Sequence, residues 1–232
     1  MRIVCISDTH CEHRNLEVGE GDILIHAGDF TDFGNLPCKI NGTLYYYNHW
    51  IDDFNDWLGD LPFTHKLFIC GNHELNLDNM TPSQVQDLVP NGTFLQESVL
   101  SIGSCNLYGV SRQPYLGSWA FGTPDDVLGA LWGSLPEDID VLVTHVPPYK
   151  TLDRVPSIMD GYIKYEYTGV PSLKKAILKH PRLKYVIFGH IHEDYGTMRL
   201  VKDNGEYVTL INASMVNHNN ELCGRKPIIF TI

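Results

Sequence analysis

The chain has 232 residues, 43% of them hydrophobic, and a formal net charge of −11 at pH 7. This length and composition suit one α/β domain over residues 1–232 with a substantial core, while the acidic balance and the lack of an evident basic patch argue against generic polynucleotide binding. An anionic substrate would need a local source of positive charge, for which bound metal ions are the obvious candidate.

Five short apolar runs, taken in chain order, predict strands that are buried on both faces. They are RIVCIS, DILIHAG, KLFIC, DVLVT and YVIFG, which precede Asp8, Asp29, Gly71, His145 and His190.

Helices are predicted between these strands from apolar residues at helical spacing. One is expected over residues 44–58, and another over 123–135, where a capping Thr precedes a Pro at the first helical position. A third, short helix is expected over residues 171–180. The last third of the chain alternates like strands around a DNG turn at 203–205 and ends in KPIIFTI, which predicts a β-hairpin and a final strand.

Polar residues gather where the predicted strands end. In open α/β sheets, active sites form at the carboxyl ends of the strands. Carboxylate, imidazole and amide oxygen groups without a thiolate suit Mn²⁺, Fe²⁺, Zn²⁺ or Co²⁺. Each segment alone is typical of a turn or a cap, but together, in one order, they indicate a metal site. The candidates are Asp8, His10, Asp29, Asn72, His73, His145, His190 and His192.

The spacing of these residues suggests how they share ions. Residues i and i+2 of an extended chain point the same way, so Asp8 and His10 are expected to converge on one ion. His190 and His192 do so only if the chain stays extended, whereas in a tighter loop they reach neighbouring ions. The ligand candidates are numerous enough for two ions, and an ion pair about 3.5–4 Å apart suits phosphoryl chemistry.

The six cysteines are scattered and include no C-x-x-C pair, which is typical of a reducing compartment. No apolar run approaches the roughly 20 residues of a membrane span, and MRIVCISDTH leads straight into a strand pattern without a signal-peptide layout. A cytoplasmic protein without a membrane segment is therefore expected.

The strand-end segments DTH, GD, GNHE, TH and GHIH resemble the calcineurin-like metallophosphoesterases, whose pattern is D-x-H, G-D, G-N-H-[DE], H and G-H-x-H. The match spans residues 8–192. Further segments, GDILIHAGDFTDFG, THVPPYKTLDR, GHIHEDYG and INASMVN, are similar to the MPPED-type metallophosphodiesterases. The resemblance implies an α-β-β-α sandwich with two mixed sheets flanked by helices.

The resemblance also implies two divalent metal ions, drawn from Mn, Fe, Zn, Co and Mg with Mn favoured. The first would be held by Asp8, His10, Asp29 and His192, and the second by Asp29, Asn72, His145 and His190.

The same resemblance implies hydrolysis by a metal-bound hydroxide. Asn72 would stabilise charge on the phosphoryl oxygens, and His73 would stand beside the leaving group, with Asp32 or Glu74 as its carboxylate partner. His26 either supports the ligands from behind or is a core histidine, and the core role is favoured.

The substrate class is suggested by a departure from the superfamily. Its protein phosphatases would read G-D-x-x-D-R-G, whereas this chain has GDFTDFG with Phe33 in place of the arginine, which favours a monoanionic diester over a dianionic monoester. The segment SRQPYLGSWAFGTP offers Arg112 as a phosphate contact and Tyr115, Trp119 or Phe121 to stack a base, although core or cap packing is the favoured role for any one of these aromatics.

The expected activity is hydrolysis of small, nucleotide-like phosphodiesters. The alternatives are a phosphomonoesterase or protein phosphatase on the same scaffold, and a non-catalytic module that binds a nucleotide or a protein. The complete ligand set argues against the last of these. Nucleic acid is not expected as a partner, and the sequence leaves the oligomeric state open.

Overall fold

The computed structural model describes residues 1–32, 38–40, 43–45, 49–159 and 162–232. In its first large sheet, β1 (Arg2–Ile6), β2 (Ile23–Ala27), β5 (His65–Ile69) and β6 (Thr93–Phe94) run parallel. The last strand, β17 (Ile228–Thr231), lies antiparallel beside β1, which gives the order β17-β1-β2-β5-β6. The apolar runs predicted as strands here are confirmed, including the final one.

The second large sheet has a parallel centre and two antiparallel edges. Its order is β15 (Gly196–Val201), β16 (Tyr207–Asn212), β14 (Tyr185–Phe188), β11 (Val141–Thr144), β8 (Cys105–Val110) and β7 (Val99–Ile102). The outermost strands β15 and β7 are the antiparallel ones. The hairpin predicted around the DNG turn is the pair β15–β16.

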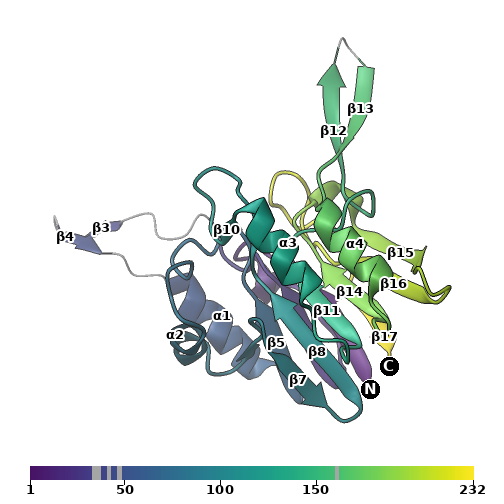
Figure 1. Ribbon diagram of the computed structural model, residues 1–232. Helices are drawn as coiled ribbons and strands as arrows, with labels where there is room; N and C mark the ends of the chain where they lie inside the picture. Colours follow the sequence, from purple (N-terminus) through teal and green to yellow (C-terminus); the bar gives the residue numbers. More distant parts are fainter. Residues whose placement is uncertain (33–37, 41–42, 46–48, 160–161) are drawn as a thin grey trace.

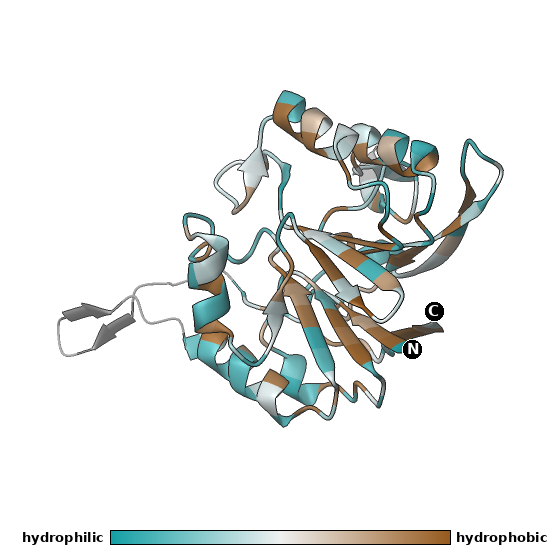
Figure 2. Cartoon of the chain, turned by 60° about the horizontal axis from the view of Figure 1, so that its bottom comes forward, coloured by the Kyte–Doolittle hydropathy of each residue, from teal (hydrophilic) through white to brown (hydrophobic). Residues whose placement is uncertain are grey.

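Three apolar cores define four layers. The central core joins the two sheets through residues such as Ile25 of β2 and Val143 of β11. On the outer face of the first sheet lie α1 (His49–Asp60) and α2 (Pro82–Leu88), and α3 (Asp125–Gly133) and α4 (Pro171–Lys179) cover the outer face of the second (Figure 1). Figure 2 shows the apolar strands between these helices. The predicted α-β-β-α sandwich is confirmed.

The helix predictions need correction at their ends. The helix expected over 44–58 begins at residue 49, because β4 (Thr43–Tyr45) pairs with β3 (Cys38–Ile40), and residues 46–48 lie outside the described part. Threonine and tyrosine are enriched in strands. In α3, Pro124 rather than Thr123 occupies the N-cap position, since the Thr123 hydroxyl donates to the carbonyl of Phe121 instead of capping the helix.

Some elements escaped the sequence analysis. The helix α2 has a capping box, in which the Thr81 hydroxyl accepts from the backbone of Gln84, and the letters TPSQ were a readable signal for it. A small parallel pair, β9 (Gln113–Pro114) and β10 (Gly122–Thr123), was also missed. So was a hairpin of β12 (Arg154–Met159) and β13 (Tyr162–Tyr167), which projects from the body (Figure 1). Among the described helices, none has the length and apolar character needed to cross a bilayer.

Candidate metal centre

The carboxyl ends of strands from both sheets meet at one edge of the sandwich. Asp8 follows β1, and its backbone N–H donates to the carbonyl of Gly28, which follows β2. From the second sheet, the N–H of Gly189 after β14 donates to the carbonyl of His145 after β11. The predicted gathering of strand ends therefore includes both sheets, and the candidate ligands lie on the seam between them.

The ligand-bearing chain turns tightly rather than staying extended. Backbone φ is +51° at Asp8, +42° at His10, +54° at Asp29 and +66° at His190. Such left-handed values are uncommon for residues with a side chain and cluster at functional sites. The extended geometry assumed for Asp8 and His10 is therefore wrong, although the two side chains still converge.

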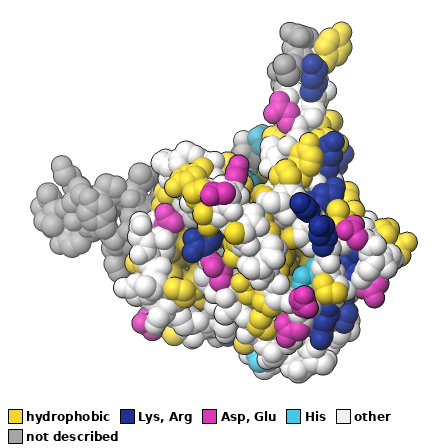
Figure 3. Space-filling view, viewed as in Figure 1, with side chains coloured by type: hydrophobic (Ala, Val, Ile, Leu, Met, Phe, Trp, Pro, Cys, Tyr) yellow, Lys and Arg dark blue, Asp and Glu magenta, His cyan; other side chains and the backbone are white. Residues whose placement is uncertain are grey.

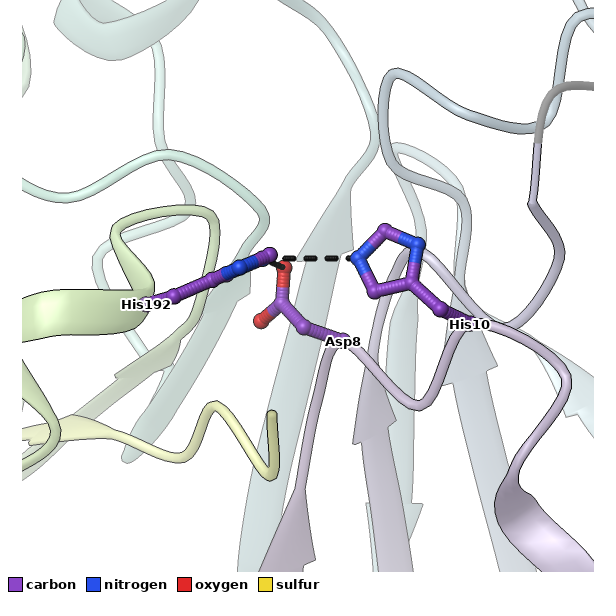
Figure 4. A group of neighbouring side chains, drawn as sticks. All are labelled: Asp8, His10 and His192. Atoms are coloured by element: carbon purple, nitrogen blue, oxygen red, sulfur yellow. Dashed lines mark hydrogen bonds and ion pairs between the residues drawn. The ribbon is translucent and has the colours of Figure 1, made fainter. Parts of the chain in front are cut away.

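A first cluster is formed by Asp8, His10 and His192 (Figure 4), whose ligand atoms lie within 4.8 Å of one another. The Nε2 atom of His192 is 3.4 Å from Oδ1 of Asp8 and 3.4 Å from Nε2 of His10. The Nδ1 atom of His192 lies 2.9 Å from the carbonyl oxygen of Asn217. Because a carbonyl only accepts, Nδ1 carries the proton, and Nε2 of a neutral ring points its lone pair into the cluster.

A second cluster is formed by Asp29, His145 and His190, with Asn72 beside it. The Nε2 atom of His145 is 3.1 Å from Oδ2 of Asp29 and 3.0 Å from Oδ1 of Asn72. Its Nδ1 atom donates to the carbonyl of Ala27 at 2.9 Å. His190 and His192 thus belong to different clusters, as expected for the tighter of the two loops considered.

Both clusters fit a divalent cation. In each, an imidazole whose Nδ1 faces a backbone carbonyl turns Nε2 toward a carboxylate oxygen, so a neutral ring would place two acceptors face to face without a donor between them. A cation removes this conflict, and so does a second proton on the ring. Carboxylate, imidazole and amide oxygens are ligands that Mn²⁺, Fe²⁺ and Zn²⁺ accept.

The electrostatics of the clusters agree with a demand for positive charge. Burial alone would raise the pKa of Asp8, but the hydrogen bond and charge of His192 outweigh it and hold this pKa well below its usual value. Burial would likewise raise the pKa of Asp29, but the charge and hydrogen bond of His145 outweigh it and lower this pKa. Burial lowers the pKa of His145, yet Asp29 dominates and raises it to about 9. In His190, burial and the charge of His145 lower the pKa to about 4, which favours the neutral form that binds metals.

Several supporting contacts were missed by the sequence analysis. The Ser214 hydroxyl donates to Oδ2 of Asp8 at 2.6 Å, and the N–H of His190 donates to both oxygens of the same carboxylate at 3.0 Å. Ser214 and Asn217 belong to the segment INASMVN, which the resemblance singled out without assigning roles. These contacts orient the carboxylate and the His192 ring, which is how neighbouring groups tune metal ligands.

His73 lies beside both clusters and contacts Asp32. Its Nδ1 atom is 3.2 Å from Oδ1 of Asp32, its backbone N–H donates to Asp29, and its ring meets that of His10 edge to face at 4.5 Å. His10, Asp32 and His73 form a third group whose ligand atoms lie within 4.8 Å of one another. Of the two carboxylates considered as partners of His73, the one in ionic contact is therefore Asp32.

Glu74 has a different role. Its carboxylate accepts backbone N–H groups from Asp29, Thr31 and Gly71 at 2.6–2.9 Å, and thereby ties the loops after β2 and β5 together. Burial and the nearby charge of Asp29 raise its pKa to about 7. His26 is buried among Phe30 and Phe54 and contacts the Thr9 hydroxyl at 3.0 Å, as a core histidine would.

The residues proposed to contact substrate differ in position. Arg112 donates to Glu97 at 2.5 Å and lines a cavity with Asp78 and Phe121. Trp119 packs its indole against His73 with ring centroids 4.5 Å apart. Within this segment, Trp119 is therefore in contact with the candidate site. Phe33, which replaces the arginine of protein phosphatases, lies outside the described residues.

Basic side chains gather on one face, over α4 (Figure 3), which corrects the expectation of no basic patch. Lys179, Arg182 and Lys184 lead into the start of β14, whereas the candidate ligands follow its carboxyl end. Arg182 and Lys184 are also paired with the buried carboxylate of Asp140 at 3.0 Å. This basic face therefore lies away from the candidate ligands and is partly neutralised.

A four-layer sandwich with two carboxylate–imidazole clusters at the seam of its sheets defines a protein that binds divalent metal ions. The model of the calcineurin-like phosphoesterase family matches residues 1–194, and the chain belongs to that family. Its members are metal-dependent hydrolases of phosphoesters, so the same description holds for this chain at that level.

Curated relatives agree with the family assignment. The chain is 34% identical over 241 residues to human metallophosphoesterase domain-containing protein 1, covering 94% of this chain and 67% of that protein. It is 33% identical over 245 residues to a UPF0046 protein of Caenorhabditis elegans, covering 100% of this chain and 75% of that protein. These matches confirm the similarity to the MPPED-type subgroup. One solved structure aligns with a TM-score of 0.55 at 14% identity over 91% of this chain and 89% of that one, which supports the fold alone.

Proposed function

We propose that this protein is a dinuclear metal-dependent phosphodiesterase that hydrolyses small, nucleotide-like phosphodiesters. The observation that carries the proposal is the pair of clusters in which imidazole Nε2 atoms face carboxylate oxygens. Each cluster has its own convergent set of acceptors, which supports two ions rather than one. The backbone N–H of His190, a member of the second cluster, donates to both oxygens of Asp8 in the first, so the clusters adjoin. Paired ions are suited to displacement at phosphorus.

The preference for a diester is supported by the scarcity of fixed cations. In the described residues, the ion pairs of Asp8 and Asp29 are all with imidazoles and none is with Lys or Arg. A dianionic monoester benefits more from an added arginine than a monoanionic diester does, because it carries more charge. Since no Lys or Arg is paired with these two carboxylates in the part of the chain that the structure describes, we take the diester as the better match to this centre.

The protein's own groups have distinct roles in this proposal. When bound, divalent ions supply positive charge to the phosphoryl oxygens and lower the pKa of water towards neutrality. The side-chain amide of Asn72 donates to a phosphoryl oxygen as charge develops there. His73, oriented by Asp32, donates a proton or hydrogen bond to the departing oxygen. Its Nδ1 faces Asp32, and its Nε2 lies 3.9 Å from Oδ2 of Asp29, on the side of the candidate ligands.

The decisive experiment compares two chromogenic esters. Metal-stripped protein is assayed with bis-p-nitrophenyl phosphate and p-nitrophenyl phosphate after adding Mn²⁺, Zn²⁺, Mg²⁺ or buffer. Metal-restored turnover that favours the diester supports the proposal. Preference for the monoester would instead indicate a phosphomonoesterase, and two bound equivalents without any turnover would favour a binding module.

The role of His73 is tested with a matched pair of variants. H73A is expected to lower turnover by about 10²–10⁴-fold, the usual contribution of general acid catalysis, with metal content preserved. H65A removes a histidine from the opposite end of β5 and is expected to leave turnover unchanged. Wild-type turnover in H73A would remove His73 from the mechanism.

Three earlier expectations stay predictions. Manganese as the preferred ion is to be decided by the metal series above. Arg112 as a phosphate contact needs its pair with Glu97 to open. The cytoplasmic location rests on the cysteine pattern, and free thiols are found at Cys5, Cys11, Cys70, Cys105 and Cys223.

A further inference from the structure

The segment between β9 and β10 is fastened to the loop that carries Asn72 and His73. The N–H of Ala120 donates to the carbonyl of Asn72 at 3.1 Å, and the N–H of Phe121 donates to the Asp78 carboxylate at 2.7 Å. The side chain of Gln113 closes the base of the segment by donating to the carbonyl of Ala120 at 2.7 Å. These contacts hold residues 115–121 at a fixed position beside the candidate centre.

Trp119 is the side chain of this segment that meets the centre. Its ring centroid lies 4.5 Å from that of His73 with the ring planes inclined by 37°, so the two rings form a wedge rather than a flat stack. His10 and Asp32 already occupy other sides of the imidazole. An indole is larger than an imidazole, and Trp119 is only partly buried, so part of this residue is accessible beside His73.

Two exposed apolar side chains lie on the same segment as Trp119. Tyr115 is 66% exposed and Leu116 is 39% exposed on the same segment. Tyr115 also packs over Gly122, where an added Cβ would lie 3.0 Å from its ring. An aromatic side chain in contact with a polar, metal-binding centre, as Trp119 is, suits a ligand with an apolar ring and a phosphate.

We infer that Trp119 is a substrate-contacting specificity residue, which stacks on the aromatic base of a nucleoside phosphodiester whose ester oxygen departs next to His73. The inference rests on the proposed function, because that function places the leaving group at His73. Stacking on an indole needs only a π-face, so purine and pyrimidine substrates are both accepted.

The test uses two cyclic diesters with the same five-membered ring. One is a nucleoside 2′,3′-cyclic phosphate, and the other is glycerol 1,2-cyclic phosphate, which lacks the ribose and base. Values of kcat and KM are measured for wild type, W119A, W119F and W119L, each with two metal equivalents bound. W50A is the control, since Trp50 is an exposed indole on α1.

The expected readout is a change in selectivity. Loss of a base–aromatic stack lowers the kcat/KM ratio of nucleoside to base-free diester by roughly 5- to 150-fold in W119A, chiefly through KM. W119L has a similar effect because it keeps apolar volume without a π-face, whereas W119F retains most of the ratio. W50A leaves the kcat/KM values of both diesters, and therefore their ratio, at wild-type levels.

Other outcomes overturn the inference and are distinguishable from failure of the proposed function. If W119A lowers kcat/KM for both substrates by the same factor, mainly through kcat, then Trp119 only supports His73. Wild-type protein that hydrolyses bis-p-nitrophenyl phosphate but not the nucleoside diester also refutes base stacking, while the phosphodiesterase activity stands. If no diester is hydrolysed with any metal, the proposed function fails first.

Discussion

Gly189, the residue before His190, is required by a close approach between the sheets. A Cβ built on Gly189 would overlap Oδ2 of Asp8 and Oγ of Ser7, and would lie 2.7 Å from Cβ of Ser7. Asp8 cannot yield easily, because it also accepts from Ser214 and from the N–H of His190. We therefore expect G189A to move the Asp8 carboxylate out of the first cluster.

The magnitude follows from overpacking and from misplacement. Adding one methyl to a close-packed site costs about 1–3 kcal/mol. For a chain of this size, that corresponds to a fall in Tm of roughly 2–12 °C. A ligand displaced by about 1 Å is expected to reduce turnover by about 100-fold. Activity should thus fall far more than the folded fraction does.

The assay compares G189A with G129A. Gly129 lies inside α3 with no atom within 4 Å of an added Cβ, so G129A is expected to be neutral or to stabilise the helix by up to about 1 kcal/mol. Metal stoichiometry, thermal unfolding and bis-p-nitrophenyl phosphate hydrolysis are measured for both. Two bound ions and wild-type turnover in G189A would refute this account of the glycine.

Three further outcomes are expected. Burial raises the pKa of Asp140, but hydrogen bonds from Arg182 and others outweigh it and lower this pKa to about 2. Because the folded pKa lies below the unfolded value, the stabilisation is present above pH 4 and is lost as the pH falls towards 2. In urea titrations, D140N should lower the free energy of unfolding by about 2 kcal/mol at pH 7 and by progressively less below pH 4. An equal loss at every pH would contradict the assignment. Burial raises the pKa of Cys5, so in folded protein iodoacetamide should label the exposed Cys223 and spare Cys5, as mass spectrometry would show. Finally, chelation should lower Tm and metal addition should restore it, since ions that bind only the folded state stabilise it; a Tm insensitive to chelator would argue against tightly held ions.

The strands and the candidate ligands were predictable because their signals are local. Continuous apolar runs define buried strands, and the polar residue that follows each run is fixed by position in the chain. Parallel strands bring such residues to one edge without any detailed geometry. Asp8, Asp29, His145 and His190 were therefore found from the sequence, since each stands directly after a predicted strand.

What the sequence could not provide is contact between distant segments. Choosing Asp32 over Glu74 as the partner of His73 needs side-chain directions, because both carboxylates lie in the loops after β2 and β5. Ser214 donates to Asp8 from 206 positions away in the sequence, and a lone serine has no sequence pattern that would predict this contact. The start of α1 was misplaced because tyrosines at helical spacing also suit a strand, where cross-strand pairing decides.

Each cluster takes ligands from both sheets, and we therefore expect metal binding to be linked to folding. In the first cluster, Asp8 comes from the first sheet and His192 from the second. In the second cluster, Asp29 comes from the first sheet and His145 from the second. Each ion would thus join the sheets at the end where the apolar core between them stops. Without ions, Nε2 of His145 faces Oδ2 of Asp29 across that seam; burial lowers the pKa of His145, but this carboxylate stabilises the protons of the charged ring and raises the pKa to about 9. Metal binding must displace such protons, so ion affinity is expected to rise with pH up to about that value.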